Sequence, residues 1–304
     1  MSKTNKVIAL GFFDGVHLGH AALLNAVKEI AGSIDAVPAV LSFDSHPDNY
    51  VSGKPVQLIC NNAARADIIR RVYGIEKIIF LHFNRNVMQT GWEEFAQSLI
   101  DELSAVHLVV GHDFRFGYRG MGTARLLQEY CARRGVGCRI VPKVTHDGVT
   151  VSSTYIRRLI ADGDMERANE FLGHPHLLVD TVRYGYKLGR KIGTPTINMM
   201  FPDNVITPRF GVYAAKVILE DGEHLAVTNI GVRPTVSGGD SVSVESFILD
   251  FDGNLYERQV RVEFYRFLRP EMRFASLAEL KLQISQDAAL TRAFFERSGE
   301  LTRI

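Results

Sequence analysis

The strongest constraint on the fold is an alternation of short apolar runs with amphipathic stretches in the first half of the chain. Apolar runs at 7–10, 39–43, 77–80 and 106–110 alternate with helix-like stretches at 21–30, 64–72, 92–102 and 124–133. Strands and helices that alternate at this spacing form βαβ units around a parallel sheet. Ligands of such sheets bind beyond the carboxyl ends of the strands. We therefore expect an α/β domain with its site at that edge.

The pattern changes after residue 153. Residues 154–172 predict one or two short amphipathic helices, which Gly173, His174 and Pro175 interrupt. Short β-like runs follow at 177–184, 212–219, 226–230, 242–250 and 259–267, with hairpin signals at 220–222 and 250–253. In 277–297, apolar residues at 277, 280, 284, 288 and 290 indicate an amphipathic helix. These features predict a small β-barrel or sandwich with a C-terminal helix packed against it.

Composition removes several classes of function. The 35 Lys and Arg residues nearly balance the 34 Asp and Glu residues, so the chain lacks the broad positive field of a non-specific nucleic-acid binder. Three cysteines make neither an even disulfide framework nor paired zinc knuckles, which is typical of a reducing compartment. No signal sequence or membrane span is evident. We expect a cytoplasmic protein with no nucleic-acid or membrane partner; nothing in these features determines an oligomeric state.

Residues 11–20, GFFDGVHLGH, follow the first apolar run and open the first helix. Backbone amides at a helix N-terminus bind anions, and His17 and His20, three residues apart, can donate to phosphate oxygens on one side. Two histidines are also common as surface or core residues, and no nearby Cys or third His completes a zinc site. The stretch resembles the HxGH signature of the nucleotidyltransferase superfamily. The resemblance implies phosphate contacts from Gly11, Phe12, Asp14, Gly15 and Gly19.

A second phosphate-binding candidate spans 151–157, VSSTYIR. Ser153 and Thr154 provide hydroxyls at a helix N-terminus, and Arg157 lies one turn further on, an arrangement that suits ATP phosphates as well as simple capping. It resembles the ISSTxxR motif that accompanies HxGH. The two motifs together imply that His17, His20 and Arg157 stabilise charge on a departing pyrophosphate.

Two further motifs follow expected strands, FDSHP at 43–47 and GHDFRFG at 111–117. They resemble signatures of the adenylyltransferase half of prokaryotic bifunctional FAD synthetases, except that Ser45 stands where proline is usual. The aromatic rings at 114 and 116 suit a planar isoalloxazine, with core packing as the alternative. The resemblance implies flavin contacts from His46, Pro47, Asp113, Phe114 and Phe116.

A glycine-rich basic loop, GYKLGRKIGTPTIN at 185–198, allows a backbone to approach polyphosphate closely. Thr196 and Asn198, two apart on one face of an extended segment, offer neutral oxygens to Mg²⁺. The loop closely resembles the GxPTAN motif of riboflavin kinases. The resemblance implies ATP contacts from Gly189, Arg190, Gly193 and Pro195.

The riboflavin kinase resemblance continues through 211–214, 229–235, 244–251, 255–256 and 267–274. It implies that Glu245 is the general base that takes the proton from the terminal ribityl hydroxyl, and that Arg273 contacts the flavin. The sequence departs from the family at two positions. Asp180 replaces a usual glycine, and Phe247 replaces a frequent histidine and so removes a polar partner of the base.

Together the motifs are similar to a prokaryotic bifunctional riboflavin kinase and FMN adenylyltransferase over essentially the whole chain. The resemblance implies a Rossmann-like domain at 1–173 that adenylylates FMN and a kinase barrel at 178–304 that phosphorylates riboflavin, both with ATP and Mg²⁺. No P-loop motif is present. Two alternatives remain open: a barrel that binds flavin without phosphorylating it, and a nucleotidyltransferase with an acceptor such as phosphopantetheine or nicotinamide mononucleotide.

Overall fold

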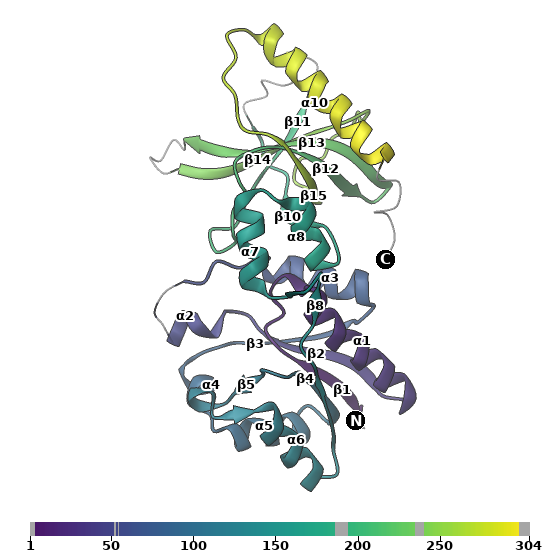
Figure 1. Ribbon diagram of the computed structural model, residues 1–304, viewed down its shortest axis with the longest axis vertical. Coiled ribbons are helices and arrows are strands. Elements are labelled where there is room, and N and C mark those ends of the chain that lie inside the picture. Colours follow the sequence, from purple (N-terminus) through teal and green to yellow (C-terminus); the bar gives the residue numbers. More distant parts are fainter. Residues whose placement is uncertain (1–3, 52, 54, 186–193, 235–239, 298–304) are drawn as a thin grey trace. The chain divides into compact units, whose positions relative to one another are not determined.

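The computed structural model describes residues 4–51, 53, 55–185, 194–234 and 240–297. The chain divides into two compact units, residues 1–57 with 65–153 and residues 58–64 with 154–304. Each unit is built around a sheet of its own (Figure 1). Among the helices of the described ranges, none combines the length and the apolar composition that crossing a membrane demands.

The first unit contains a five-stranded parallel sheet in the order β3-β2-β1-β4-β7. Its strands are β1 (Lys6–Leu10), β2 (Val37–Phe43), β3 (Lys77–Leu81), β4 (Ala105–Gly111) and β7 (Gly137–Val141). The first four confirm the expected strands, whereas β7 had no sequence prediction. From β1 the chain adds β2 and then β3 on one side of the sheet, whereas from β4 it adds β7 on the other side. In sheets of this kind, ligands usually bind in the crevice beyond the carboxyl ends of the two strands where the direction changes, here β1 and β4.

Helices cover both faces of this sheet, which is why residues 7–10 of the central strand are all buried. The helices are α1 (Leu18–Ser33), α2 (Pro47–Val51), α3 (Asn62–Tyr73), α4 (Arg85–Gln89), α5 (Trp92–Asp101) and α6 (Ala124–Arg133). Leu10, Leu41 and Leu108 pack with Leu99 and Leu127 of α5 and α6. Short elements complete the unit: η1 (Asp14–Val16), β5 (Arg115–Phe116), η2 (Tyr118–Gly120), β6 (Gly122–Thr123), β8 (Thr145–His146) and β9 (Val149–Thr150).

The second unit contains a six-stranded antiparallel sheet in the order β10-β15-β12-β13-β14-β11. Its strands are β10 (His176–Thr181), β11 (Thr196–Met200), β12 (Gly211–Leu219), β13 (Gly222–Pro234), β14 (Asp240–Ile248) and β15 (Gln259–Arg269). A bridge joins Arg183, just after β10, to Asn198 of β11, so the two edges of the sheet approach each other. The expected barrel is therefore a curled half-barrel.

One of the two predicted hairpins is confirmed and the other is wrong. Leu219 pairs with Gly222, so residues 220–222 form the β12–β13 turn. The signal at 250–253 does not join neighbouring strands, because β14 pairs with β13 and β11 while β15 pairs with β10 and β12. Turn-forming residues report a local change of direction, whereas strand pairing depends on the rest of the sheet.

Two helices precede this sheet, α7 (Ser153–Asp162) and α8 (Met165–Leu172), as the sequence predicted. Contacts group them with the second unit from residue 154 onward. The Asn169 side chain of α8, for example, donates to the Phe264 carbonyl of β15 at 2.8 Å. The functional boundary expected at 173–178 remains a prediction.

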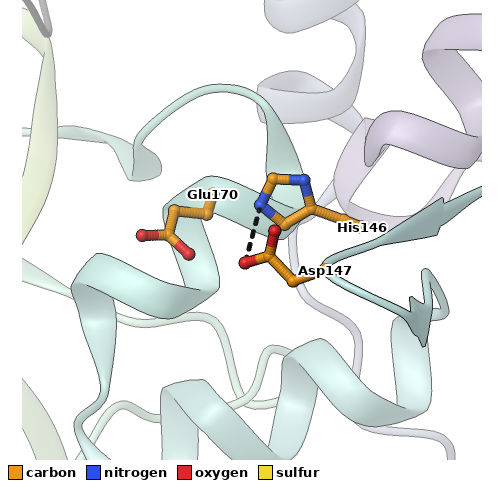
Figure 2. A group of neighbouring side chains, drawn as sticks. All are labelled: His146, Asp147 and Glu170. Atoms are coloured by element: carbon orange, nitrogen blue, oxygen red, sulfur yellow. Dashed lines mark ion pairs between the residues drawn. The ribbon is translucent and has the colours of Figure 1, made fainter.

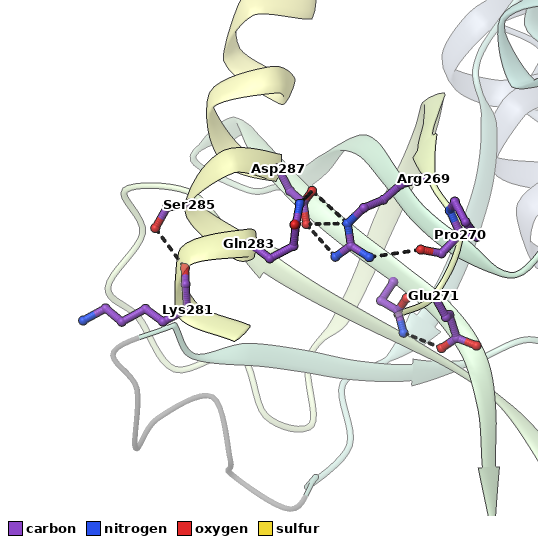
Figure 3. A network of polar contacts seen from close by, with 8 residues as sticks. Arg269, Pro270, Glu271, Lys281, Gln283, Ser285 and Asp287 are labelled. Atoms are coloured by element: carbon purple, nitrogen blue, oxygen red, sulfur yellow. Dashed lines mark hydrogen bonds and ion pairs between the residues drawn. The ribbon is translucent and has the colours of Figure 1, made fainter. Parts of the chain in front are cut away.

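The C-terminal helix α10 (Leu277–Arg297) confirms the expected element and its bounds. Ala288 packs against an apolar cluster of Val212, Val227 and Leu249. The expected apolar face is wrong at its ends, because Leu277 and Leu290 each keep about half of their surface exposed while Asp287 is buried. Arg269 of β15 binds that carboxylate, so a polar contact helps to set the face that α10 turns toward the sheet (Figure 3).

Candidate active sites

The turn after β1 places the predicted phosphate-binding residues at the start of α1. Phe13 adopts a left-handed conformation with φ 59° and Gly15 has φ 73°, so the backbone reverses sharply between strand and helix. Phe13, Asp14 and Val16 are buried, and the helix begins after His17, its N-cap. The backbone amides of this first turn point toward the predicted anion position.

The two histidines of this turn stack directly on each other. Their ring centroids lie 3.7 Å apart with an interplanar angle of 10°. The His20 backbone N–H donates to Nδ1 of His17 at 3.3 Å, so a neutral His17 carries its proton on Nε2. A Cβ on Gly19 would lie 3.1 Å from the His17 ring, which explains the glycine between the histidines.

His20 is held in its neutral form. Burial, followed by the nearby His17 and Arg65, lowers the pKa of its imidazole well below the ordinary value. Its Nδ1 atom is buried and has no hydrogen-bond partner among the described residues. The described residues therefore leave one polar atom of this buried ring without a hydrogen bond.

The second phosphate motif meets the first one through Ser153. Its hydroxyl donates to the Asp14 carbonyl at 3.3 Å, although 139 residues separate the two. Thr154 is exposed and Arg157 is half-buried on the following turns of α7. Their approach to the histidine pair remains a prediction, because these residues belong to the second unit.

The loop after β2 is organised by Asp44. Burial favours its neutral acid, but hydrogen bonds from His82 and the Phe83 backbone outweigh burial and hold the Asp44 pKa below its usual value. Ser45, at the position where proline was expected, donates to Asp44 at 3.2 Å. This hydrogen bond restricts the conformation of the loop, as a proline at the same position would.

His46 and Pro47 follow this carboxylate. The His46 ring contacts the Phe12 ring edge-on at a centroid distance of 4.6 Å, and Pro47 begins α2. The loops after β1 and β2 are therefore in direct contact. The roles of these two loops toward ATP and flavin remain predictions.

The loop after β4 holds the other predicted flavin residues. Asp113 is exposed, and the Phe114 and Phe116 rings stack with centroids 5.3 Å apart. Phe116 is buried in the core, and Phe114 is partly buried against it. Phe116 packs in the core, as the core-packing alternative expects, and the flavin roles of Phe114 and Phe116 both remain predictions.

Arg65 is a candidate that the motifs did not reveal. It lies on α3 with none of its surface exposed, and its guanidinium donates to the backbone carbonyl of Phe12. An arginine on an amphipathic helix is ordinarily solvated. The sequence places Arg65 between two alanines, Ala64 and Ala66, and this is the signal that could have suggested its burial. The structure shows that both alanines are buried.

Strand pairing in the second unit aligns Glu245, the predicted base, with Asn198, a predicted metal ligand, and with Asn229 in one row across three strands. Asn198 of β11 and Asn229 of β13 both pair with Glu245 of β14, one on each side. Directly paired residues share a face of an antiparallel sheet, so the Glu245 carboxylate lies between two side-chain amides. Thr196 lies two residues before Asn198 on the same face. Asn229 was not identified as a site residue from the sequence.

The donor set of Thr196 and Asn198 suits a hard cation. A hydroxyl and an amide oxygen are neutral oxygen ligands of the kind that Mg²⁺ accepts beside phosphate oxygens. A Cβ on Gly185 would lie only 2.5 Å from the Asn198 amide nitrogen, so this glycine leaves space for that side chain. Thr196 also lines a cavity of about 390 Å³ together with Pro195, Leu255 and Tyr256. Gly189, Arg190 and Gly193 lie outside the described residues.

The two departures from the kinase pattern have structural roles. The Asp180 carboxylate accepts a hydrogen bond from the Met200 backbone at 3.0 Å and contacts Arg183 at 3.4 Å. Phe247 packs against the apolar cluster beneath α10. Asn198 still pairs with Glu245, and Phe247 itself is the residue that pairs with Thr196.

The segment after β15 reaches the same row. The Asn229 amide donates to the Glu271 carboxylate at 3.1 Å, and a Cβ on Gly231 would lie 2.1 Å from that carboxylate. Arg273 is exposed two residues further on. This segment therefore borders the Glu245 site.

Two further ionisable residues, His146 and Asp147, belong to none of the predicted motifs. His146 and Asp147, at the β8–β9 hairpin, form a contact of 3.8 Å (Figure 2). Glu170, drawn with them, belongs to α8 of the second unit, where it binds Arg167 at 2.6 Å. We assign no role to this group.

Comparisons with known families match a different family model to each half of the chain. A model described as FAD synthetase matches residues 1–155, and a model described as riboflavin kinase matches residues 172–295. The bifunctional riboflavin kinase/FMN adenylyltransferase of Listeria monocytogenes is 36% identical over 295 residues, covering 96% of this chain and 93% of the relative. The chain belongs to this family. It is therefore a two-activity transferase with its FAD synthetase domain first and its riboflavin kinase domain second.

Other bifunctional riboflavin kinase/FMN adenylyltransferases show the same full-length similarity. The Pseudomonas fluorescens protein is 36% identical and covers 94% of this chain and 92% of its own length. The Escherichia coli K12 protein is 34% identical, with 95% and 92% covered. A solved Streptococcus pneumoniae structure titled macrolide-efflux protein is 29% identical, has a TM-score of 0.83, and covers 96% of this chain and 95% of its own. That likeness supports the fold described above.

Proposed function

We propose that the stacked His17 and His20 pair stabilises the pyrophosphate that leaves during adenylylation of FMN. A phosphate oxygen of FMN attacks the α-phosphorus of ATP, the bond to the bridging oxygen breaks, and pyrophosphate departs. A neutral His17 donates through Nε2, and His20 stacks against the His17 ring and holds it in place. Arg157, with Ser153 and Thr154, contacts the phosphates. The stacked geometry at the start of α1 is the observation that supports these roles most directly.

In the second unit, Glu245 prepares the nucleophile. The terminal ribityl hydroxyl of riboflavin attacks the γ-phosphorus of ATP, Glu245 takes its proton, and ADP leaves. The row of Asn198, Glu245 and Asn229 supports this role, because a carboxylate between two amides is positioned without being neutralised. Thr196 and Asn198 would hold Mg²⁺, which neutralises phosphate charge when bound.

The remaining assignments follow from the same two sites. The flavin of FMN contacts His46, Pro47, Asp113 and the face of Phe114, while Arg273 contacts riboflavin. Residues 1–173 carry adenylyl transfer and residues 178–304 carry the kinase. The three free cysteines agree with a reducing, cytoplasmic compartment.

A chromatographic time course with riboflavin, ATP and Mg²⁺ tests these roles. Wild type yields FMN and then FAD. Glu245→Gln, which keeps the shape of the base, makes FAD from added FMN and loses about 10²-fold or more of its FMN formation. His17→Asn accumulates FMN. If either variant retains the wild-type rate of its own step, the corresponding residue does not act as proposed.

A further inference from the structure

Arg65 is the largest fully buried side chain among the described residues. Arginine is seldom buried completely unless its charge is compensated by several polar groups. The contacts of this guanidinium therefore indicate what the buried charge does.

The Arg65 guanidinium binds backbone oxygens of two neighbouring loops. Nη1 donates to the Phe12 carbonyl and, at 2.9 Å, to the Ser42 hydroxyl, while Nη2 donates to the Phe43 carbonyl at 3.2 Å. The Ser42 hydroxyl donates to the same Phe12 carbonyl at 2.9 Å. The end of β2 and the turn after β1 are thus joined through one cation.

Aromatic rings enclose the same cation. Its central carbon lies 4.3 Å from the Phe12 ring centroid and 5.2 Å from that of Phe80 on β3. The Phe12 ring in turn contacts His46. A planar guanidinium with several fixed donors can satisfy this arrangement, whereas a lysine has a single ammonium group to offer.

The two joined loops carry different substrates in the adenylyl transfer site. Phe12 directly precedes the buried turn that leads to His17 and His20, and Phe43 precedes the loop that carries His46. A shift of one loop relative to the other changes the distance between the reacting phosphates. Misplacement of about 1 Å costs about 100-fold in rate.

We propose that Arg65 is a positioning residue for FMN adenylylation, which holds the histidine turn and the His46 loop at the separation that transfer requires. The inference rests on the proposed assignment of this site to the ends of β1 and β2. Arg65 acts through its contacts to two backbone carbonyls, the Ser42 hydroxyl and two aromatic rings.

The experiment measures both activities of the full-length chain in Arg65→Met, Arg65→Lys, Ser42→Ala and a control, Arg71→Met. Arg71 lies on the same helix, with 61% of its side chain exposed and a contact to Asp67 at 2.6 Å. The kinase activity of the same polypeptide reports whether the chain is intact. Circular dichroism reports the folding of the parallel-sheet unit.

We expect Arg65→Met to lower kcat for FMN adenylylation about 100-fold with a smaller change in either KM, because positioning acts on the reacting geometry. Arg65→Lys recovers part of that loss. Ser42→Ala, which removes one donor to the Phe12 carbonyl, loses about 2- to 10-fold in the same direction. The kinase rate of all four variants and the adenylylation rate of Arg71→Met stay at the wild-type value.

Two results would overturn the proposal. One is a folded Arg65→Met whose adenylylation kcat stays within about threefold of wild type. The other is a Ser42→Ala variant with the wild-type kcat for adenylylation. This second result decides the question if Arg65→Met does not fold. The His17→Asn variant distinguishes a failure of the Arg65 proposal from a wrong assignment of the adenylyl transfer site. If His17→Asn made FAD at the wild-type rate, the site assignment itself would be refuted.

Discussion

The contact between Arg269 and Asp287 attaches α10 to the curled sheet, and Asp287→Ala tests its strength (Figure 3). Nε of Arg269 lies 3.0 Å and Nη2 lies 2.8 Å from the two carboxylate oxygens. Gln283 donates to the same carboxylate at 3.0 Å. Asp287 itself is 1% exposed, so its removal leaves the arginine without its main partner.

The expected loss follows from this burial. Breaking a buried ion pair on one side costs about 3 to 5 kcal/mol, because the remaining charge stays desolvated. The Arg269 side chain keeps 17% of its surface exposed and still donates to the Pro270 carbonyl at 3.0 Å, so we expect the lower end, about 3 kcal/mol. For a unit of this size, that loss lowers the Tm by about 6 to 12 °C.

Calorimetry of the full chain measures this shift. Riboflavin stabilises the unit that binds it and so identifies the relevant transition. Arg292→Ala is the matched control, because Arg292 lies on the same helix and contacts Asp250 at 2.7 Å with side chains that are 43% and 75% exposed. An exposed pair of this kind contributes less than about 1 kcal/mol.

Two outcomes would refute the reasoning. The first is a decrease in the free energy of unfolding of Asp287→Ala that is no larger than the decrease in Arg292→Ala. The second concerns the double variant Arg269→Met with Asp287→Leu, which removes both charges and should regain most of the stability. A double variant whose loss equals the sum of the single losses would show that the buried charge is not the cause.

Three further predictions concern single residues. Burial, with a smaller effect of His174, lowers the His176 pKa to about 3, below its ordinary value of 6.5. The native state therefore excludes a proton that the unfolded chain accepts, so stability is complete above pH 6.5 and falls toward pH 3. His176→Phe should flatten this loss, about 2 kcal/mol between pH 6.5 and 4.5, in urea titrations; an unchanged slope contradicts it. Gly19→Ala should lower FAD synthesis at least about tenfold, because the new Cβ displaces the His17 ring, while FMN formation stays constant. Asn198→Leu should abolish FMN formation at any Mg²⁺ concentration and spare FAD synthesis from FMN; recovery at high Mg²⁺ would contradict a ligand role.

Local patterns were sufficient to predict most elements. The apolar run of β1, the glycine-bracketed turn and the start of α1 lie within one continuous stretch, so their order and geometry follow from neighbouring residues. The bounds of α10 were also predicted, because helical periodicity is a local property. The hairpin expected at 250–253 failed because turn residues carry no information about the partner strand.

The sequence by itself determined two domain types, the chemistry of their motifs and the identity of most candidate residues. The tertiary structure alone decided which distant residues meet. Ser153 reaches Asp14 across 139 residues, and strand register places Glu245 between Asn198 and Asn229. Periodicity along a chain shows which side of a helix or strand is apolar. The register between strands, and the groups that a buried cation such as Arg65 contacts, depend on packing between elements.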